Sequence, residues 1–168
     1  MSGPSGAPGE PQLGAVVQEV ARLFRRRFAE RARAADLPFN RNQCQVLANL
    51  ARHEGVTQAA LAQLLDMEPI ALVRLLDGLQ EAGMVERRVN PRDRRCWMLY
   101  LTPAAAPVLQ QIRVVATAVR EEALGGVPPE RQAPLLADLL RLKENLAGAL
   151  RPAAEEREAA APARAATR

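Results

Sequence analysis

The stretch that decides the fold runs from Glu86 to Pro103 and reads ERRVNPRDRRCWMLYLTP. It opens with charged residues, contains the turn signal Asn90-Pro91 and closes with alternating apolar residues, which predicts two short strands joined by a loop. Five arginines surround a single aspartate in this segment. Because arginine is the side chain best suited to phosphates and base edges, the loop is a candidate contact for nucleic acid.

Helical segments are expected before this hairpin, because apolar residues recur there at spacings of three and four. The expected ranges are 13–36, 41–53, 58–65 and 69–82. Pro38 stops the first helix and Gly55 the second, while Thr57 is expected to cap the third. Pro69 suits the first turn of the fourth helix, which Gly83 closes.

The third and fourth predicted helices are joined by a tight break at residues 66–68, as in a helix-turn-helix. In that motif the second helix enters the major groove of DNA with its N-terminal residues near base edges. A hairpin directly after it occupies the position of a wing, which can reach across a phosphate backbone into the adjacent minor groove. The expected apolar positions of the fourth helix are Ile70, Val73, Leu75, Leu76 and Leu79.

Two further apolar stripes follow the hairpin. Thr102-Pro103 is expected to start a fifth helix with apolar residues at 108, 112, 115 and 119, and a last helix has leucines at 135, 139, 142, 146 and 150. This alternation of four and three is typical of coiled-coil surfaces. A two-fold partner would bury these two stripes and the apolar stripe of the first helix. Dimerisation is assigned to Val16, Val20, Leu135, Leu139, Leu142 and Leu146.

Composition restricts the class of function. The chain has 23 basic and 19 acidic residues, and every basic residue except Lys143 is an arginine. Two cysteines and one histidine are too few for a structural zinc site made of these residues alone. Without a Gly-rich phosphate loop or a GxSxG motif, we predict no enzyme activity, no metal and no cofactor. We expect a cytoplasmic protein, since no signal peptide or apolar run of membrane-spanning length is found.

The fold class predicted from these patterns is mainly α with a small β-hairpin wing. Residues 1–11 are rich in Gly, Pro and Ser, and residues 151–168 are rich in Ala with mixed charge, so both ends are expected to be disordered. One domain is expected at 12–150. Within it, a winged-helix lobe is assigned to 56–103 and a helical dimerisation region to 12–36 and 104–150.

The segment from about residue 39 to 103 resembles the MarR family of winged helix-turn-helix transcription regulators. The matching stretches are VTQAALAQLL at 56–65, IALVRLLDGLQEAGMVERR at 70–88 and NPRDRRCWMLYLTP at 90–103. The most specific part is the pair Asp93 and Arg95, followed at a fixed distance by Leu-Thr-Pro. The fragment ALVRLLDGL further resembles the SlyA-like branch. Pro107 departs from the family pattern and is expected to kink the fifth helix.

The resemblance implies a role for each matching residue. Arg94 matches the wing-tip arginine of the minor groove, Asp93 and Arg95 match the pair that braces the wing, and Arg74 matches the arginine that approaches bases. The whole set expected at DNA is Thr57, Gln58, Pro69, Ala71, Leu72, Arg74, Arg92, Arg94 and Arg95. The family picture also implies a dimeric repressor that leaves a palindromic operator when a small aromatic or anionic ligand binds. Cys44 and His53 are the candidate pocket residues.

Two alternatives remain open. The protein could instead be a thiol-redox-responsive regulator that uses Cys44 or Cys96. Peroxide-sensing members of the family carry their reactive cysteine near the start of the first helix, where this chain has none. A winged-helix module that binds proteins rather than DNA is the other alternative. Such a module would not need Arg74 and the three arginines of the loop together on one side.

Overall fold

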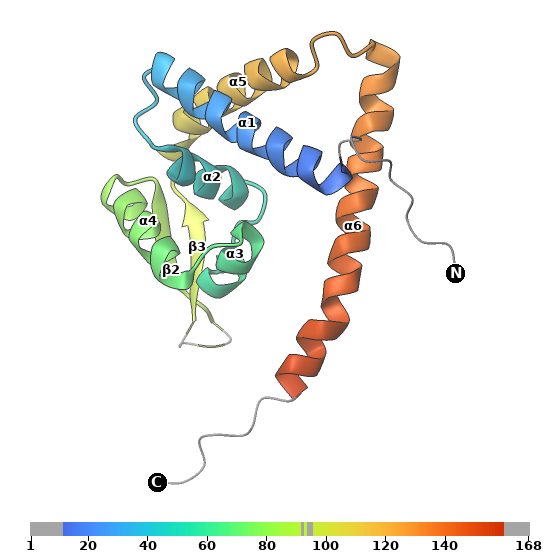
Figure 1. Ribbon diagram of the computed structural model, residues 1–168. Helices are drawn as coiled ribbons and strands as arrows, with labels where there is room; N and C mark the ends of the chain where they lie inside the picture. The colour runs from blue at the N-terminus through green and yellow to red at the C-terminus, as the bar shows by residue number, and fades with distance from the viewer. Residues whose placement is uncertain (1–11, 92, 94–95, 160–168) are drawn as a thin grey trace. The chain divides into compact units, whose positions relative to one another are not determined.

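A computed structural model describes residues 12–91, 93 and 96–159, with side chains as far as residue 149. The chain forms two compact units that divide between Ala123 and Leu124. The first unit contains α1 (Leu13–Ala34), α2 (Arg41–Leu50), β1 (Val56–Thr57), α3 (Gln58–Leu65), α4 (Pro69–Glu81), β2 (Val85–Val89), β3 (Trp97–Leu101) and α5 (Ala105–Ala123) (Figure 1). The second unit contains α6 (Pro129–Ala159).

Side-chain caps start the helices on either side of β1. The predicted cap of α3 is confirmed, because the Thr57 hydroxyl accepts a hydrogen bond from the backbone N–H of Ala60 at 3.2 Å. The cap of α2 was not predicted: Asn40 and Gln43 form a capping box in which each side chain accepts a bond from the other's backbone N–H. These caps satisfy N–H groups that a helix start would otherwise leave without a partner.

The sheet has three antiparallel strands in the order β1-β3-β2. The predicted hairpin is β2 and β3, with Val85 opposite Leu101 and Val89 opposite Trp97. The strand β1 pairs with the other edge of β3 and was not predicted, because two residues show no periodicity. The Thr102 hydroxyl does not fill the predicted role of a helix cap here, since it donates to the carbonyl of Gly83 at 2.5 Å. That bond joins the end of β3 to the end of α4.

The core of the first unit lies between α2, α3, α4, α5 and the sheet. Its fully buried leucines are Leu47, Leu50, Leu61, Leu72, Leu76, Leu79 and Leu99. Of the apolar positions expected for α4, Ile70 lies outside the core: it is 69% exposed, whereas Leu72, which was not among them, is fully buried. The helix presents residues 72, 76 and 79 to the core, and position 70 falls on the opposite side at 100° per residue.

The apolar stripe of α5 also belongs to this core. Val108, Ile112, Val115 and Val119 are only 4–8% exposed, and α5 packs against α1 and α2 of the same chain. The prediction that a partner chain buries this stripe was therefore wrong. The predicted kink at Pro107 has no cause either, because α5 begins at Ala105. Pro107 thus stands in the first turn, where a backbone N–H has no partner within the helix.

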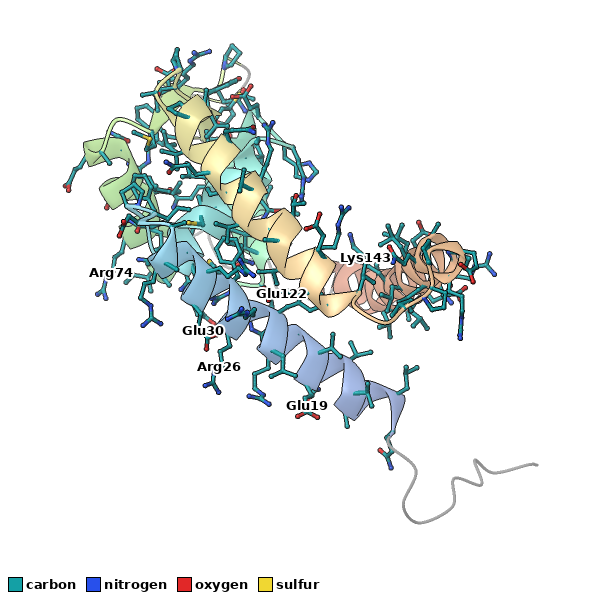
Figure 2. All side chains as sticks on the ribbon, turned by 90° about the horizontal axis from the view of Figure 1, so that it is seen from above. Glu19, Arg26, Glu30, Arg74, Glu122 and Lys143 are labelled. Atoms are coloured by element: carbon teal, nitrogen blue, oxygen red, sulfur yellow. The ribbon has the colours of Figure 1, made fainter. Side chains whose placement is uncertain are left out.

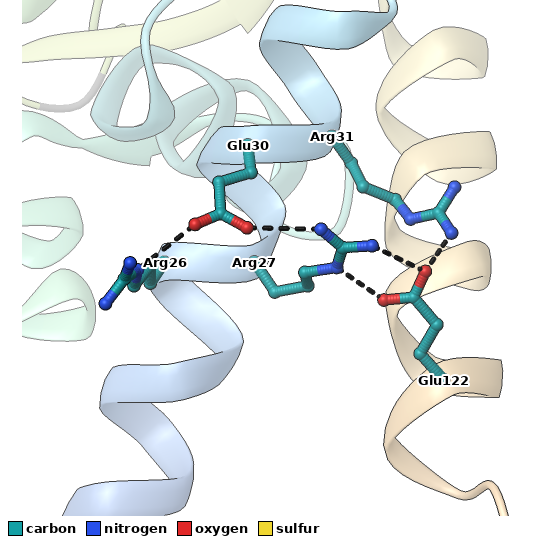
Figure 3. A network of polar contacts seen from close by, with 5 residues as sticks. All are labelled: Arg26, Arg27, Glu30, Arg31 and Glu122. Carbon is teal, nitrogen blue, oxygen red and sulfur yellow. Dashed lines mark hydrogen bonds and ion pairs between the residues drawn. The ribbon is translucent and has the colours of Figure 1, made fainter.

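Ion pairs join α1 to α5 near the C-terminal end of α5 (Figure 3). Arg27 donates to both carboxylate oxygens of Glu122, at 2.6 and 3.1 Å, and Arg31 donates to one of them. Arg27 also donates to Glu30 at 3.1 Å, which receives a second bond from Arg26. These arginine bonds lower the pKa of Glu30. One carboxylate on α5 therefore holds two arginines of α1.

The second unit is one long helix with exposed leucines. α6 continues to Ala159, so the predicted start of a disordered tail at residue 151 was wrong. The other segments predicted to be disordered, 1–11 and 160–168, lie outside the described residues. Leu135, Leu139, Leu142 and Leu146 are between 36% and 67% exposed.

Candidate nucleic-acid interface

The outer face of α4 is exposed to solvent and is therefore available for binding. Arg74 is exposed on this face, and Figure 2 shows it at the periphery of the molecule. Pro69 and Ala71, both predicted to meet DNA, are exposed in the first turn of the helix. Leu72 was predicted to join them, and that prediction was wrong, because its side chain is fully buried in the core. Sequence reasoning missed Ile70, which lies one turn before Arg74 on the outer face.

The start of α3 carries two further predicted contacts. Thr57 and Gln58 are half-buried at the N-terminus of this helix. Backbone N–H groups at a helix start point along the axis and can bind a phosphate oxygen. The Thr57 side chain itself is engaged with the N–H of Ala60. The predicted phosphate contact therefore depends on backbone amides.

Two of the five arginines in the decisive stretch contact the protein itself. Arg87 donates to Asp77 at 2.6 Å and to Gln80 at 2.7 Å, so it joins β2 to the outer side of α4. Arg88 pairs with Glu86 and lies over the ring of Tyr100, 4.3 Å from its centroid. Arg87 therefore attaches the wing to α4, and Arg88 contacts residues of the two wing strands. The other predicted DNA contacts of this stretch, Arg92, Arg94 and Arg95, lie outside the described residues.

The described part of the wing turn is organised around Asp93. Its carbonyl accepts the N–H of Cys96 at 3.0 Å, and its carboxylate accepts the Cys96 thiol at 3.4 Å. The carboxylate raises the pKa of this thiol through that bond and through its charge. The predicted brace between Asp93 and Arg95 stays a prediction, since Arg95 is not among the described residues.

A cavity of about 470 Å³ lies between α1, α2 and α5. Its wall is mostly apolar, with Arg25, Arg41 and Gln45 as the polar members; the remaining lining residues are Ala21, Phe24, Phe28, Cys44, Ala48, Ile112, Ala116 and Val119. The predicted pocket residue Cys44 therefore lines a cavity. His53 does not line it and is exposed beyond the end of α2. Burial raises the pKa of the Cys44 thiol to about 11, which keeps it protonated at neutral pH.

The described residues 12–91, 93 and 96–159 contain neither a metal site nor a membrane-spanning helix. No group of three or more His, Cys, Asp and Glu side chains there could hold a metal ion. None of the helices in that part of the chain combines the length and apolar character needed to cross a membrane.

The chain is similar to known proteins over most of its length. A family model described as MarR family matches residues 35–95. The crystal structure of the transcriptional regulator PA3341 is 34% identical, has a TM-score of 0.70, and the match covers 82% of this chain and 99% of that one. Wild-type MarR from E. coli in its apo form is 25% identical, with a TM-score of 0.70 and coverage of 80% and 98%. A mutant MarR from E. coli complexed with operator DNA is 27% identical, with a TM-score of 0.66 and coverage of 77% and 92%.

The exposed start of α4, the short break before it and the hairpin after it define a winged helix-turn-helix protein. The predicted fold class is confirmed by this arrangement and by the solved structures. The chain belongs to the MarR family of transcriptional regulators. Its place in the SlyA-like branch stays a prediction.

Proposed function

We propose that this protein is a sequence-specific DNA-binding regulator that acts as a homodimer on a palindromic operator and represses transcription. One observation carries the proposal. Arg74 is exposed on a helix whose other side is fixed in the core by Leu72, Leu76 and Leu79. A helix held in this way can present an arginine to base edges in the major groove without further ordering.

The proposed mode of binding assigns a different task to each part of the lobe. The first half of α4 enters the major groove, where Arg74 donates two bonds to a guanine. Arg92, Arg94 and Arg95 reach the adjacent minor groove and its phosphates, with Asp93 bracing the turn. Thr57 and Gln58 bind a phosphate at the start of α3. The structure of a mutant E. coli MarR complexed with operator DNA supports DNA binding by a protein of this fold.

Exposed apolar side chains support the proposed dimer. Val16 and Val20 lie 40% and 44% exposed on α1, and the four leucines of α6 are exposed as well. Contiguous apolar stripes of this kind mark protein interfaces, and a two-fold partner can cover each stripe with its own copy. Because helix-turn-helix dimers bind two half-sites related by the same symmetry, a dimer of this chain requires a palindromic operator.

We further propose that the cavity between α1, α2 and α5 holds the effector. An apolar wall with Arg25 and Arg41 suits a small aromatic anion, whose ring packs on Phe24 and Phe28 while its charge meets a guanidinium. The thiols favour this ligand-responsive regulator over the redox alternative. Cys44 is buried, and the pKa values of Cys44 and Cys96 are both raised, which lowers the thiolate fraction that oxidants attack.

The experiment that tests the proposed function compares two arginines on operator DNA. The operator is first obtained by sequencing the genomic fragments that the protein retains at moderate salt. Arg74→Ala should weaken operator binding by about 1–3 kcal/mol and relax selectivity at one or two base pairs. Arg94→Ala should weaken binding to many sequences and lower the slope of log affinity against log salt by about one unit.

Arg113→Ala provides the matched control, because it removes the same charge from an exposed position on α5. It should leave operator affinity and the salt slope close to those of the wild type. DNA binding that is weak, independent of salt and unaffected by Arg74→Ala would support the protein-interaction module and contradict the proposed function.

A further inference from the structure

Ile70 is an aliphatic side chain that the fold holds in solvent. It is 69% exposed, in the first turn of α4, although it belongs to the apolar pattern of this helix. Leu72, Leu76 and Leu79 fix the rotation of α4, because all three are fully buried. Position 70 therefore cannot turn inward without removing these leucines from the core.

Ile70 and Arg74 share the outermost line of the helix. At 100° per residue, positions four apart differ by only about 40°, and their Cα atoms lie about 6 Å apart along the axis. That separation is close to two base-pair steps of about 3.4 Å each. A helix that presents Arg74 to one base edge therefore presents Ile70 to a base about two steps away.

Charge along the same face selects the segment that can approach DNA. Glu81, the last residue of α4, lies on this face and is an exposed carboxylate that phosphates repel. Asp77, also on the outer side, is neutralised by Arg87 at 2.6 Å. Ile70 and Arg74 precede both acidic positions on this face, so the N-terminal half of the face carries the apolar side chain and the cation.

We propose that Ile70 is a specificity-determining residue that contacts the C5-methyl group of a thymine in the major groove, beside the base that Arg74 contacts. The proposal rests on the proposed function and goes further by assigning a chemical feature of the operator. An aliphatic side chain can neither donate nor accept a hydrogen bond. The thymine methyl is the apolar group that the floor of the major groove offers to it.

The test begins with the full-length protein and a pool of random DNA duplexes, from which wild type and Ile70→Ala each select their preferred sites. Each thymine of the wild-type consensus is then replaced by deoxyuridine, which removes only the methyl group. For wild type we expect one position per half-site where this replacement weakens binding about fourfold, the equivalent of one buried methyl-sized group. Replacement in both half-sites should weaken a dimer by about 15-fold.

Ile70→Ala should bind the thymine operator more weakly than wild type and should no longer distinguish thymine from deoxyuridine at that position. Alanine is a strong helix former, so the variant should remain folded, which circular dichroism and its urea midpoint can verify. Leu64→Ala is the matched control, since Leu64 is another exposed aliphatic residue, 50% exposed on α3. It should keep the sensitivity of wild type to deoxyuridine.

The outcomes distinguish a failure of the role proposed for Ile70 from a failure of the proposed function. If wild type selects a palindrome but no thymine methyl matters, or if Ile70→Ala keeps full sensitivity to deoxyuridine, the role of Ile70 is wrong and the proposed function stands. If wild type selects no sequence, both are wrong. In that case the exposed side chain of Ile70 would fit the protein-interaction module instead.

Discussion

Arg87 offers a sharp test of how the wing is attached to the recognition helix. The substitution Arg87→Met keeps a long, unbranched side chain but removes the guanidinium that bonds to Asp77 and Gln80. We expect the variant to unfold more easily, because two hydrogen bonds between β2 and α4 are lost. We also expect its salt dependence of DNA binding to match wild type, because Arg87 is engaged within the protein and neutralises no phosphate.

The size of the expected loss in unfolding free energy follows from how exposed Arg87 and Asp77 are. The Arg87 side chain is 20% exposed and that of Asp77 is 51% exposed, so the ion pair is screened and contributes about 0.2–1 kcal/mol. The bond to the neutral amide of Gln80 contributes about 0.5–1.5 kcal/mol. The free energy of unfolding should therefore fall by about 1–2 kcal/mol. A double-mutant cycle with Asp77→Ala should give a coupling energy of about 0.5–1 kcal/mol.

Trp97 is the only tryptophan of the chain and lies on β3, so its fluorescence reports urea unfolding of this lobe. All variants are compared at one protein concentration, because assembly contributes to apparent stability. Arg74→Met is the matched control: Arg74 is exposed, so its loss should change stability by less than about 0.5 kcal/mol while operator affinity falls. An Arg87→Met variant with wild-type stability and a salt slope lower by one unit would refute the reasoning, since Arg87 would then contact phosphate.

Three further predictions concern assembly, the buried thiol and the cavity. Leu139→Glu combined with Leu146→Glu should yield monomers that lose specific DNA binding; a native protein that elutes as a monomer at micromolar concentration would contradict the dimer. Burial raises the pKa of Cys44 from 9.0 to about 11, so the native state holds the thiol proton more tightly than the unfolded state. The free energy of unfolding should therefore decline as pH rises through this range, and its slope with pH should be smaller in Cys44→Ala. Benzoate, as a small aromatic anion, should raise the melting temperature of the wild type. The double variant Arg25→Gln, Arg41→Gln should show a smaller rise. Equal stabilisation of the wild type and the double variant would place the benzoate site elsewhere.

Local signals in the sequence predicted local structure well. The cap at Thr57, the end of α4 at Gly83 and the hairpin after it are each determined by a few neighbouring residues, and the structure confirms them. The capping box of Asn40 and Gln43 has a recognisable spacing and could have been found in the same way. The boundaries of most helices followed from such signals.

The sequence could not determine which partner buries an apolar face. The stripe of α5 has the same spacing as a coiled-coil surface, yet α1 and α2 of the same chain bury it. In α4 the letters IALVRLL are apolar on nearly every side, so periodicity could not distinguish Ile70 outside from Leu72 inside. The bond from Arg87 to Asp77, ten residues away, depends on how β2 folds back along α4. Each of these features is a property of tertiary packing.

The position of α1 has a thermodynamic consequence. One side of this helix contributes Phe24, Arg25 and Phe28 to the cavity, and the same helix carries Val16 and Val20 on its exposed stripe. If the stripe is a dimer interface, a small molecule in the cavity and a second copy of the chain are two ligands of one helix. Linkage is then reciprocal: whatever factor the small molecule applies to the dimerisation constant, dimerisation applies to the affinity for the small molecule. Where that factor differs from one, the measured effector affinity changes with protein concentration over the range in which the dimer forms.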